Sequence, residues 1–431
     1  MELYAIIATS IFIFSFIAIL SNKVHRTIVV WVGCIAMILL GKYSGFLTEK
    51  DALSFIDFNV IGLLLGMMVI AAILEISGFF EFAAIKAAKM SRGSPSLILI
   101  FLGTTTTIVS LFVDNTTAIL IMVPLTIKIA DTLKISAVPL LLAEALLSDT
   151  GGVATLIGDP PNIMIASAAG FNFTSFVVHL GPAVILSWLF SLFYLMWFYK
   201  KWRKEKPNKS EIMKMNEWGA IKNKKMMYIS LTILLFTIFL FIINDFFLNF
   251  AVATIALIGA GLALLFNLPD IDSVSKNIEW SVLLFFAGLF VLVGSIEKVG
   301  ILRWIGEGIV NLSHGNLTLT IILVIWISAL ASSVVDNIPF TAAMIPIIAH
   351  MGEMGIATTP LFWALALGVG FGGNGTPIGS TANVVTISFA SKTKHAISTK
   401  EWLKGGTPVM LITCASSTVL LILFQKFFMG S

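Results

Sequence analysis

Two long apolar stretches of this chain are interrupted by the same three residues, Val-Asp-Asn. The first interruption lies at Val113–Asn115 and the second at Val335–Asn337. Asp114 is the only ionisable residue between positions 97 and 125, and Asp336 is the only one between positions 317 and 348. An aspartate at the centre of a membrane segment costs roughly 2.5–3.5 kcal/mol on insertion scales, so it usually marks a functional site. We interpret the rest of the chain as the scaffold that brings these two aspartates together.

The composition predicts a membrane protein with many spans. Hydrophobic residues make up 58% and charged residues 12% of the chain, whereas soluble domains are usually about one quarter charged. Many apolar stretches have the length that crosses a bilayer, so we expect an all-α polytopic protein in the plasma membrane, with lipid around it. The net charge of +4 comes from Lys and Arg in loops between spans, and it indicates no nucleic-acid partner. Residues 3–20 are expected to be a retained first span, not a cleaved signal.

The first half, residues 1–198, predicts three spans, a hairpin, a broken helix and a final span. The spans lie near 3–20, 27–41 and 58–74. The next apolar run, 97–129, is too long for one crossing of about 20 residues, so we expect a re-entrant hairpin that turns at Asp114. Residues 138–169 form two half-spans, because the Gly-Gly and Pro-Pro pairs between them mark a helix that stops and restarts.

The second half, residues 226–431, repeats this order, with a hairpin at 317–350 and a broken helix at 361–391. The register is kept at a constant offset of 222 and then, after one lost residue, of 221; the matched pairs are Asp57–Glu279, Gly66–Gly288, Glu75–Glu297, Gly78–Gly300, Asp114–Asp336, Asn115–Asn337, Pro124–Pro346, Pro139–Pro360, Gly152–Gly373, Thr155–Thr376, Gly158–Gly379 and Asn162–Asn383. Each half crosses the membrane an odd number of times, so the two halves are predicted to be inverted repeats. Inverted repeats with helices broken at matching positions are typical of secondary transporters.

The halves are joined by a basic loop at 199–225. It carries ten Lys or Arg residues against three Glu, so the positive-inside rule predicts that the loop is cytoplasmic. The same count of spans puts Lys23 and Arg26 on the cytoplasmic side.

We expect the two hairpin tips and the two helix breaks to meet and to supply the substrate- and ion-binding groups. Helix N-termini and unwound carbonyls at such breaks bind ions in transporters. The candidates are Asp114, Asn115, Thr116 and Thr117 at the first tip, Asp149, Thr155, Asp159 and Asn162 at the first break, Asp336 and Asn337 at the second tip, and Asn374, Thr376, Ser380, Thr381 and Asn383 at the second break. The alternative is that Asp and Asn only cap the helices that follow them.

The charge of these four elements predicts the kind of solute. They contain four aspartates and no Lys or Arg, so protons, a Na⁺ ion near Asp114 and Asp336, or a neutral hydroxylated solute fit directly. A permanently anionic solute would be repelled unless cations came with it. Neighbouring carboxylates in a dry site do not both stay ionised, so one can alternate between a proton and a cation, as an exchanger requires.

Other classes of protein lack their signatures here. No G-x-x-x-x-G-K-[ST] or H-E-x-x-H motif occurs, and no nucleophile with its base and orienting group stands out, so we expect neither an enzyme nor a bound cofactor. Cys34 and Cys414 lie far apart in apolar runs and suggest no disulfide or metal site. A passive channel and an attached ATPase subunit stay open.

The runs V-D-N-T-T-A-I-L-I-M-V-P (113–124) and G-G-V-A-T-L-I-G-D-P-P-N-I-M-I (151–165) resemble the ArsB/NhaD permease family of the ion-transporter superfamily, nearest the branch that includes the pigmentation P protein. The resemblance implies a scaffold domain, a transport domain that holds both tips and both breaks, and homodimers that work by an elevator motion. Related sodium-coupled carboxylate carriers have S-N-T at the tips, where Asp114 and Asp336 stand here. From the residues and the resemblance together, we expect a proton-coupled antiporter that exports a small inorganic solute, arsenite- or antimonite-like or Na⁺. A sodium-coupled anion or carboxylate transporter is the alternative.

Overall fold

The computed structural model describes residues 3–21, 23–205, 207 and 209–429, and the regular secondary structure of this part of the chain is helical, with no strand. Seven of its helices are long and apolar enough to cross a membrane, and shorter apolar helices accompany them. The prediction of an all-α polytopic membrane protein is thereby confirmed.

The helices follow the order expected for each half. The first half contains α1 (Leu3–Leu20), α2 (Arg26–Ser44), α3 (Glu49–Ser54), α4 (Phe58–Ser77), α5 (Phe79–Met90), α6 (Pro95–Ser110), α7 (Asn115–Leu133), α8 (Val138–Gly152), α9 (Pro160–Ala169) and α10 (Phe173–Phe198). The loop carries η1 (Trp202–Lys204), α11 (Lys209–Lys214) and η2 (Trp218–Ala220). The second half contains α12 (Lys224–Ile243), the π-helix η3 (Asn244–Leu248), α13 (Val252–Asn267), α14 (Ile271–Lys276), α15 (Trp280–Val299), α16 (Ile301–Leu312), α17 (Leu317–Ser332), α18 (Asn337–Glu353), α19 (Thr359–Gly372), η4 (Gly373–Gly375), α20 (Thr381–Ser391), α21 (Thr399–Leu423) and α22 (Gln425–Met429).

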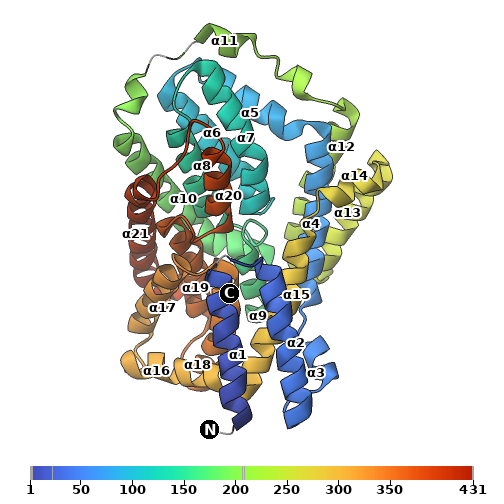
Figure 1. The fold of residues 1–431 in the computed structure, drawn as a ribbon, viewed down its shortest axis with the longest axis vertical. Coiled ribbons are helices and arrows are strands. Elements are labelled where there is room, and N and C mark those ends of the chain that lie inside the picture. Colours follow the sequence, from blue (N-terminus) through green and yellow to red (C-terminus); the bar gives the residue numbers. More distant parts are fainter. Residues whose placement is uncertain (1–2, 22, 206, 208, 430–431) are drawn as a thin grey trace.

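The two hairpins approach each other from opposite ends of the molecule (Figure 1). Helices α6 and α7 descend from the end that carries α11, and α17 and α18 rise from the end that carries α16, so that both turns lie near mid-height. Helices α8–α9 and α19–α20 are interrupted at the same level. This arrangement is what inverted repeats require, while their orientation in a membrane stays a prediction.

Close packing of helices brings this interior together. Helix α8 is buried along its whole length, including its polar residues Glu144 and Asp149. Helix α4 packs against α13 through Gly66, where a side-chain carbon would come within 2.6 Å of the carbonyl carbon of Ala256. Such contacts between small residues let helix backbones approach closely and take the place of a hydrophobic driving force in lipid.

The connection between α1 and α2 is the clearest departure from expectation. The sequence predicts that Arg26 lies in a basic connection between two spans, away from the four elements of the site, and this separation from the site is wrong. Helices α1 and α2 lie side by side with their connection near mid-height, and Arg26 forms an ion pair with Asp336 at the second hairpin turn (Figure 1). The apolar pattern cannot reveal this position, because it reports which segments are buried in lipid and not which residues meet across them.

Candidate functional site

A helix begins at each of the two tips, and the aspartate of the tip caps it. Asp114 accepts hydrogen bonds from the backbone N–H groups of Thr116 and Thr117, at 3.0 and 3.1 Å, through one carboxylate oxygen. Asp336 accepts only one, from Ile338 at 3.2 Å. The difference follows from the sequence, because Pro339 stands where the first tip has Thr117, and proline has neither an N–H nor a hydroxyl. The second oxygen of Asp336 is therefore left for another partner.

A cavity of about 520 Å³ lies against the two tips. Its polar lining comes from both halves of the chain and from the α1–α2 connection: His25, Arg26, Thr116, Glu279, Ser281, Asp336 and Thr381. Apolar side chains such as Leu120 and Val384 complete the wall. A cavity of this size with few convergent polar groups has the form of a small-molecule site.

At the first tip, a hydroxyl joins two carboxyl groups. The Oγ1 atom of Thr117 lies 2.6 Å from Oδ2 of Asp114 and 2.8 Å from Oε1 of Glu279. A hydroxyl carries one hydrogen and can donate to only one of these oxygens. Because Asp114 already accepts two backbone N–H groups, the arrangement is satisfied when Thr117 donates to Asp114 and a protonated Glu279 donates to Thr117. This geometry is suited to an acid pair that shares one proton.

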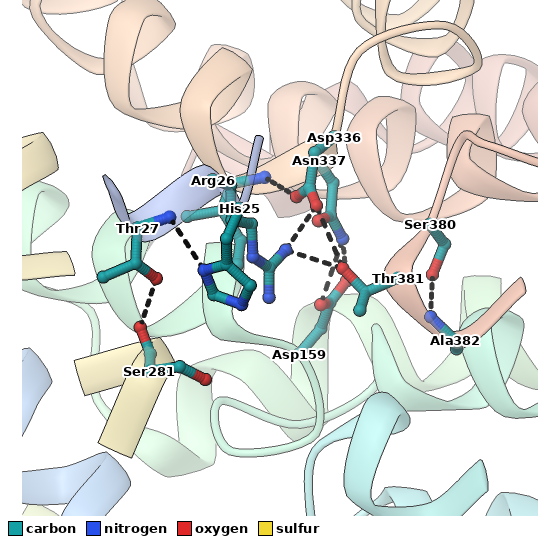
Figure 2. Close-up of polar contacts among 11 residues, drawn as sticks. His25, Arg26, Thr27, Asp159, Ser281, Asp336, Asn337, Ser380, Thr381 and Ala382 are labelled. Atoms are coloured by element: carbon teal, nitrogen blue, oxygen red, sulfur yellow. Dashed lines mark hydrogen bonds and ion pairs between the residues drawn. The ribbon is translucent and has the colours of Figure 1, made fainter. Parts of the chain in front are cut away.

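At the second tip, Arg26 supplies a positive charge. Its Nη1 donates to Oδ2 of Asp336 at 2.5 Å and to the hydroxyl of Thr381 at 2.7 Å, and that hydroxyl donates to Asp336 at 3.0 Å. The guanidinium also lies 5.1 Å from the ring centroid of Phe285. Figure 2 shows one terminal nitrogen of Arg26 directed at Asp336 and Thr381 and the other turned away from them. Nη2 and Nε have no hydrogen-bond partner within the described residues.

The start of α2 is anchored where it needs to be for this contact. Thr27 donates its hydroxyl to the carbonyl oxygen of Ser281 at 2.9 Å, which ties α2 to α15 (Figure 2). The ring Nδ1 of His25 accepts from the N–H of Thr27 at 3.3 Å and caps α2. Arg26 therefore lies at the start of a helix that packs on α15, the helix that follows Glu279.

Four of the predicted ligands brace the helix breaks. Asn162 donates to the carbonyl of Thr155 at 2.8 Å, and Asn383 donates to the carbonyls of Gly373 at 2.8 Å and Thr376 at 3.1 Å. The hydroxyl of Thr155 donates to the carbonyl of Leu111 at 2.6 Å, and that of Thr376 donates to the carbonyl of Ser333. These side chains satisfy unwound backbone and hold each break against its hairpin. Asn115 is also held inside the first hairpin, where it accepts from the hydroxyl of Ser110.

The remaining predicted residues lie between the two halves. Asn337 donates to both oxygens of Asp159, at 3.2 and 3.4 Å, so the second tip contacts the first break. Asn374 donates to the hydroxyl of Thr150 at 3.0 Å, and Ser380 caps α20. Asp149 is buried near Ser380, and neither of its oxygens has a geometrically good hydrogen bond in the described structure. Two buried acids are thus left without a cation beside them.

The structure brings the predicted tips and breaks to one region, but sequence reasoning missed two members of the site. The sequence analysis places Arg26 in a connection between spans and names Glu279 only as the repeat partner of Asp57. A signal for Glu279 existed, since it follows the repeat register from Asp57 and carries an acid there in both halves. The expectation of a site without Lys or Arg is wrong, because Arg26 enters from an element outside the hairpins and breaks.

A second, smaller cavity of about 220 Å³ lies at the corresponding place in the other half. Asp57, Met164 and Ala342 line it, and the repeat register matches them to Glu279, Val385 and Leu120 of the larger cavity. At this smaller cavity, Asp57 caps α4 and accepts from the hydroxyl of Ser167. No group of three or more His, Cys, Asp or Glu side chains with metal-ligand geometry occurs in the described part of the chain. A Na⁺ ion near Asp114 and Asp336 stays a prediction.

Comparisons with known proteins agree with a transport role. The chain is 35% identical over 428 residues to the 46 kDa membrane protein of Mycobacterium leprae, with 97% of this chain and 98% of that protein covered. It is 34% identical over 421 residues to an uncharacterized transporter of Mycobacterium tuberculosis, with the same coverage. It is 31% identical over 494 residues to the human P protein, covering 96% of this chain but only 59% of that longer protein.

The fold and the family follow from two further matches. The crystal structure of the YdaH transporter of Alcanivorax borkumensis superposes with a TM-score of 0.62 at 16% identity, covering 94% of this chain and 99% of that one, which is a likeness of fold. The likeness to the P protein agrees with the resemblance seen in the motifs, whereas these matches do not show membership of the ArsB/NhaD permease family. Residues 16–368 match the family described as CitMHS, citrate transporter. This membrane transporter therefore belongs to the CitMHS citrate transporter family.

Proposed function

We propose that this chain is a proton-coupled secondary active transporter of the plasma membrane. The observation that carries the proposal is the bridge from Asp114 through Thr117 to Glu279, which holds one proton at the edge of a cavity. An acid that can keep or give up a proton at membrane depth is the usual device by which transporters use a proton gradient.

The bridge also links the proton to movement. Asp114 and Thr117 belong to the first hairpin, whereas Glu279 stands at the start of α15, on the scaffold side with α2. If the hairpin moves away from α15, the shared hydrogen bonds break and the proton must stay with one carboxyl group. Proton loading would thus favour one position of the hairpin, which is the differential interaction that coupling requires.

A small anion with carboxylate groups is the cargo that the site supports best. Arg26 lines the cavity, and its Nη2 and Nε donors have no hydrogen-bond partner within the described residues; guanidinium groups match carboxylates in geometry. The family description, citrate transporter, supports the same class. The sequence argument against anions depended on a site without cations, and Arg26 removes that argument.

Exchange of protons for Na⁺ or for a neutral arsenite- or antimonite-like solute is the second candidate. It is favoured by Asp149 and Asp159, which are buried with no basic side chain bonded to them in the described structure. The resemblance of the Gly-Asp-Pro-Pro-Asn block to ArsB/NhaD permeases supports it as well.

One preparation tests these possibilities together. Purified protein in liposomes with an imposed pH gradient would be screened with labelled citrate, succinate, arsenite and Na⁺. We expect accumulation that collapses when a protonophore removes the gradient, and that Glu279→Gln no longer follows pH. Glu49→Gln is the matched control, because Glu49 is an exposed acid paired with Lys42. Conductance without accumulation would indicate a channel and would refute coupling.

Orientation and assembly need separate experiments. We propose that the loop at 199–225 faces the cytoplasm, which cysteine labelling from either side of intact cells would test. A homodimer and an ATPase subunit stay predictions, and crosslinking in membranes would detect either one.

A further inference from the structure

We propose that Arg26 binds the cargo anion and that Asp336 competes with the cargo for Arg26. Each anion then enters together with a proton on Asp336. This inference rests on the proposed proton coupling and adds to it the residue that selects the charge of the cargo. It depends on a different set of contacts from the Asp114–Glu279 pair.

The first step is that Arg26 is only partly used. Of its five N–H donors, those on Nη1 engage Asp336 and Thr381, and Nη2 and Nε have no hydrogen-bond partner within the described residues. The side chain is largely buried, with 19% of its surface exposed, and it lines the 520 Å³ cavity. A guanidinium with free donors at a cavity is suited to an anion with planar oxygen groups.

The second step is that an ionised Asp336 competes with an anion for the guanidinium of Arg26. Its Oδ2 atom lies 2.5 Å from Nη1, so a carboxylate cargo placed on the same guanidinium would lie beside a second negative charge. Asp336 cannot turn to a full set of other donors, because Ile338 supplies the one backbone N–H at this tip and Pro339 supplies none. A cargo anion on Nη2 and Nε and an ionised Asp336 on Nη1 therefore compete for the single positive charge of Arg26.

The third step is that a proton resolves this conflict. The cargo carboxylate accepts from Arg26, which keeps its own proton throughout, and Asp336 takes one proton to become a neutral carboxyl group. That carboxyl group can then donate to the Oγ1 of Thr381, which lies 3.0 Å away. One carboxylate group of the cargo and one proton enter together, so the charges of these two cancel at this tip.

Charged and titratable groups face Asp336 from several elements. Arg26 and His25 lie on the α1–α2 side, Glu279 lies at the start of α15, and Asp149 and Asp159 lie at the first helix break. Asp114 lies beyond them, on the first hairpin. Among the described residues, Arg26 is the only Lys or Arg that lines the cavity, so these acids and a cargo anion share one positive charge.

Equilibrium binding tests this competition. The probes are labelled citrate and labelled succinate, added to the purified full chain in detergent across a range of pH. For the native protein we expect affinity to rise as pH falls, with a slope of about one proton per anion in addition to any slope from other groups. Arg26→Gln should weaken binding about tenfold or more, as expected for the loss of charge-assisted hydrogen bonds. Arg26→Lys should restore part of the affinity, because it keeps the charge but not the fork of donors.

Asp336→Asn separates competition from a merely structural role. This variant should bind the anion more tightly than the native protein at high pH, and its pH slope should fall by about one. When Asp336→Asn is combined with Arg26→Gln, it should give no such gain in affinity, because the group for which Asp336 and the anion compete is then absent. Lys42→Gln, on the same helix but paired with Glu49 outside the cavity, is the control and should match the native protein.

The outcomes distinguish the two proposals. If neither probe binds the native protein at any pH, or if Asp336→Asn keeps the native slope, the competition is wrong even when transport follows the proton gradient. If citrate binds as expected but its accumulation ignores the gradient, the proposed proton coupling fails and the assignment of Arg26 as the anion-binding residue stands.

Discussion

Removal of the Thr117 hydroxyl tests the proton-holding bridge most directly. Thr117→Val keeps the shape of the side chain and deletes two contacts, of 2.6 Å to Asp114 and 2.8 Å to Glu279. One contact is to an ionised acceptor, for which about 1.5–3 kcal/mol is usual, and the other leaves a carboxyl donor without its acceptor. A combined loss of about 3 kcal/mol in the coupled state corresponds to a rate roughly 10²-fold lower.

The assay is gradient-driven accumulation in liposomes, with thermal stability in detergent measured on the same sample. Thr132→Val is the matched control, because this hydroxyl, on the same helix, donates only to the carbonyl of Lys128 at its own end of α7. We expect Thr117→Val to lose pH-driven accumulation while it unfolds near the native temperature. Accumulation within about twofold of the native rate, with unchanged pH dependence, would refute the role of the bridge.

Three further predictions concern the scaffold around the site. The Lys89 ammonium, 2.5 Å from Glu217, holds the pKa of that carboxyl below its usual range. The docking of the loop on α5 should therefore persist above the ordinary pKa of glutamate and weaken as pH falls through the lowered pKa. Hydrogen exchange at residues 215–220 would detect this pH dependence, which Lys89→Gln should abolish. Gly66→Leu should destabilise the protein by about 3 kcal/mol, since a side chain there overlaps the backbone of Ala256, and a large fall in melting temperature checks it. Asn383→Ala should cost about 2 kcal/mol, because two carbonyls of the break lose their donor, and thermal inactivation of transport would measure this.

Much of the architecture could be predicted because its signals are local. The hairpin expected at 97–129 corresponds to α6 and α7, and the broken helix expected at 138–169 corresponds to α8 and α9. Segment length, Gly and Pro pairs and one aspartate in each apolar run were sufficient, because each limits the backbone within a few residues. Asp114 and Asp336 each serve both as a helix cap and as a member of the site, so the capping and functional interpretations did not exclude each other.

The site itself was less predictable because its key contacts join distant segments. Arg26 meets Asp336 across 310 positions, and Glu279 meets Thr117 across 162. A charge between two apolar runs is usually a surface residue that sets topology, so the general rule pointed away from Arg26. The side chains of the predicted ligands Asn162 and Asn383 donate to unwound carbonyls of their own helix breaks. Nothing in the spacing of the sequence reveals that these carbonyls need donors.

Arg26 makes the two cavities of the duplicated halves chemically unequal. In the repeat register, Leu248 occupies the position that corresponds to Arg26, so the smaller cavity beside Asp57 has no guanidinium of its own from that place. In a carrier built this way, a solute that arrives past Arg26 would meet a guanidinium, whereas a solute that arrives past Asp57 would meet a carboxyl group. Uptake and release should therefore proceed at different rates under equal gradients.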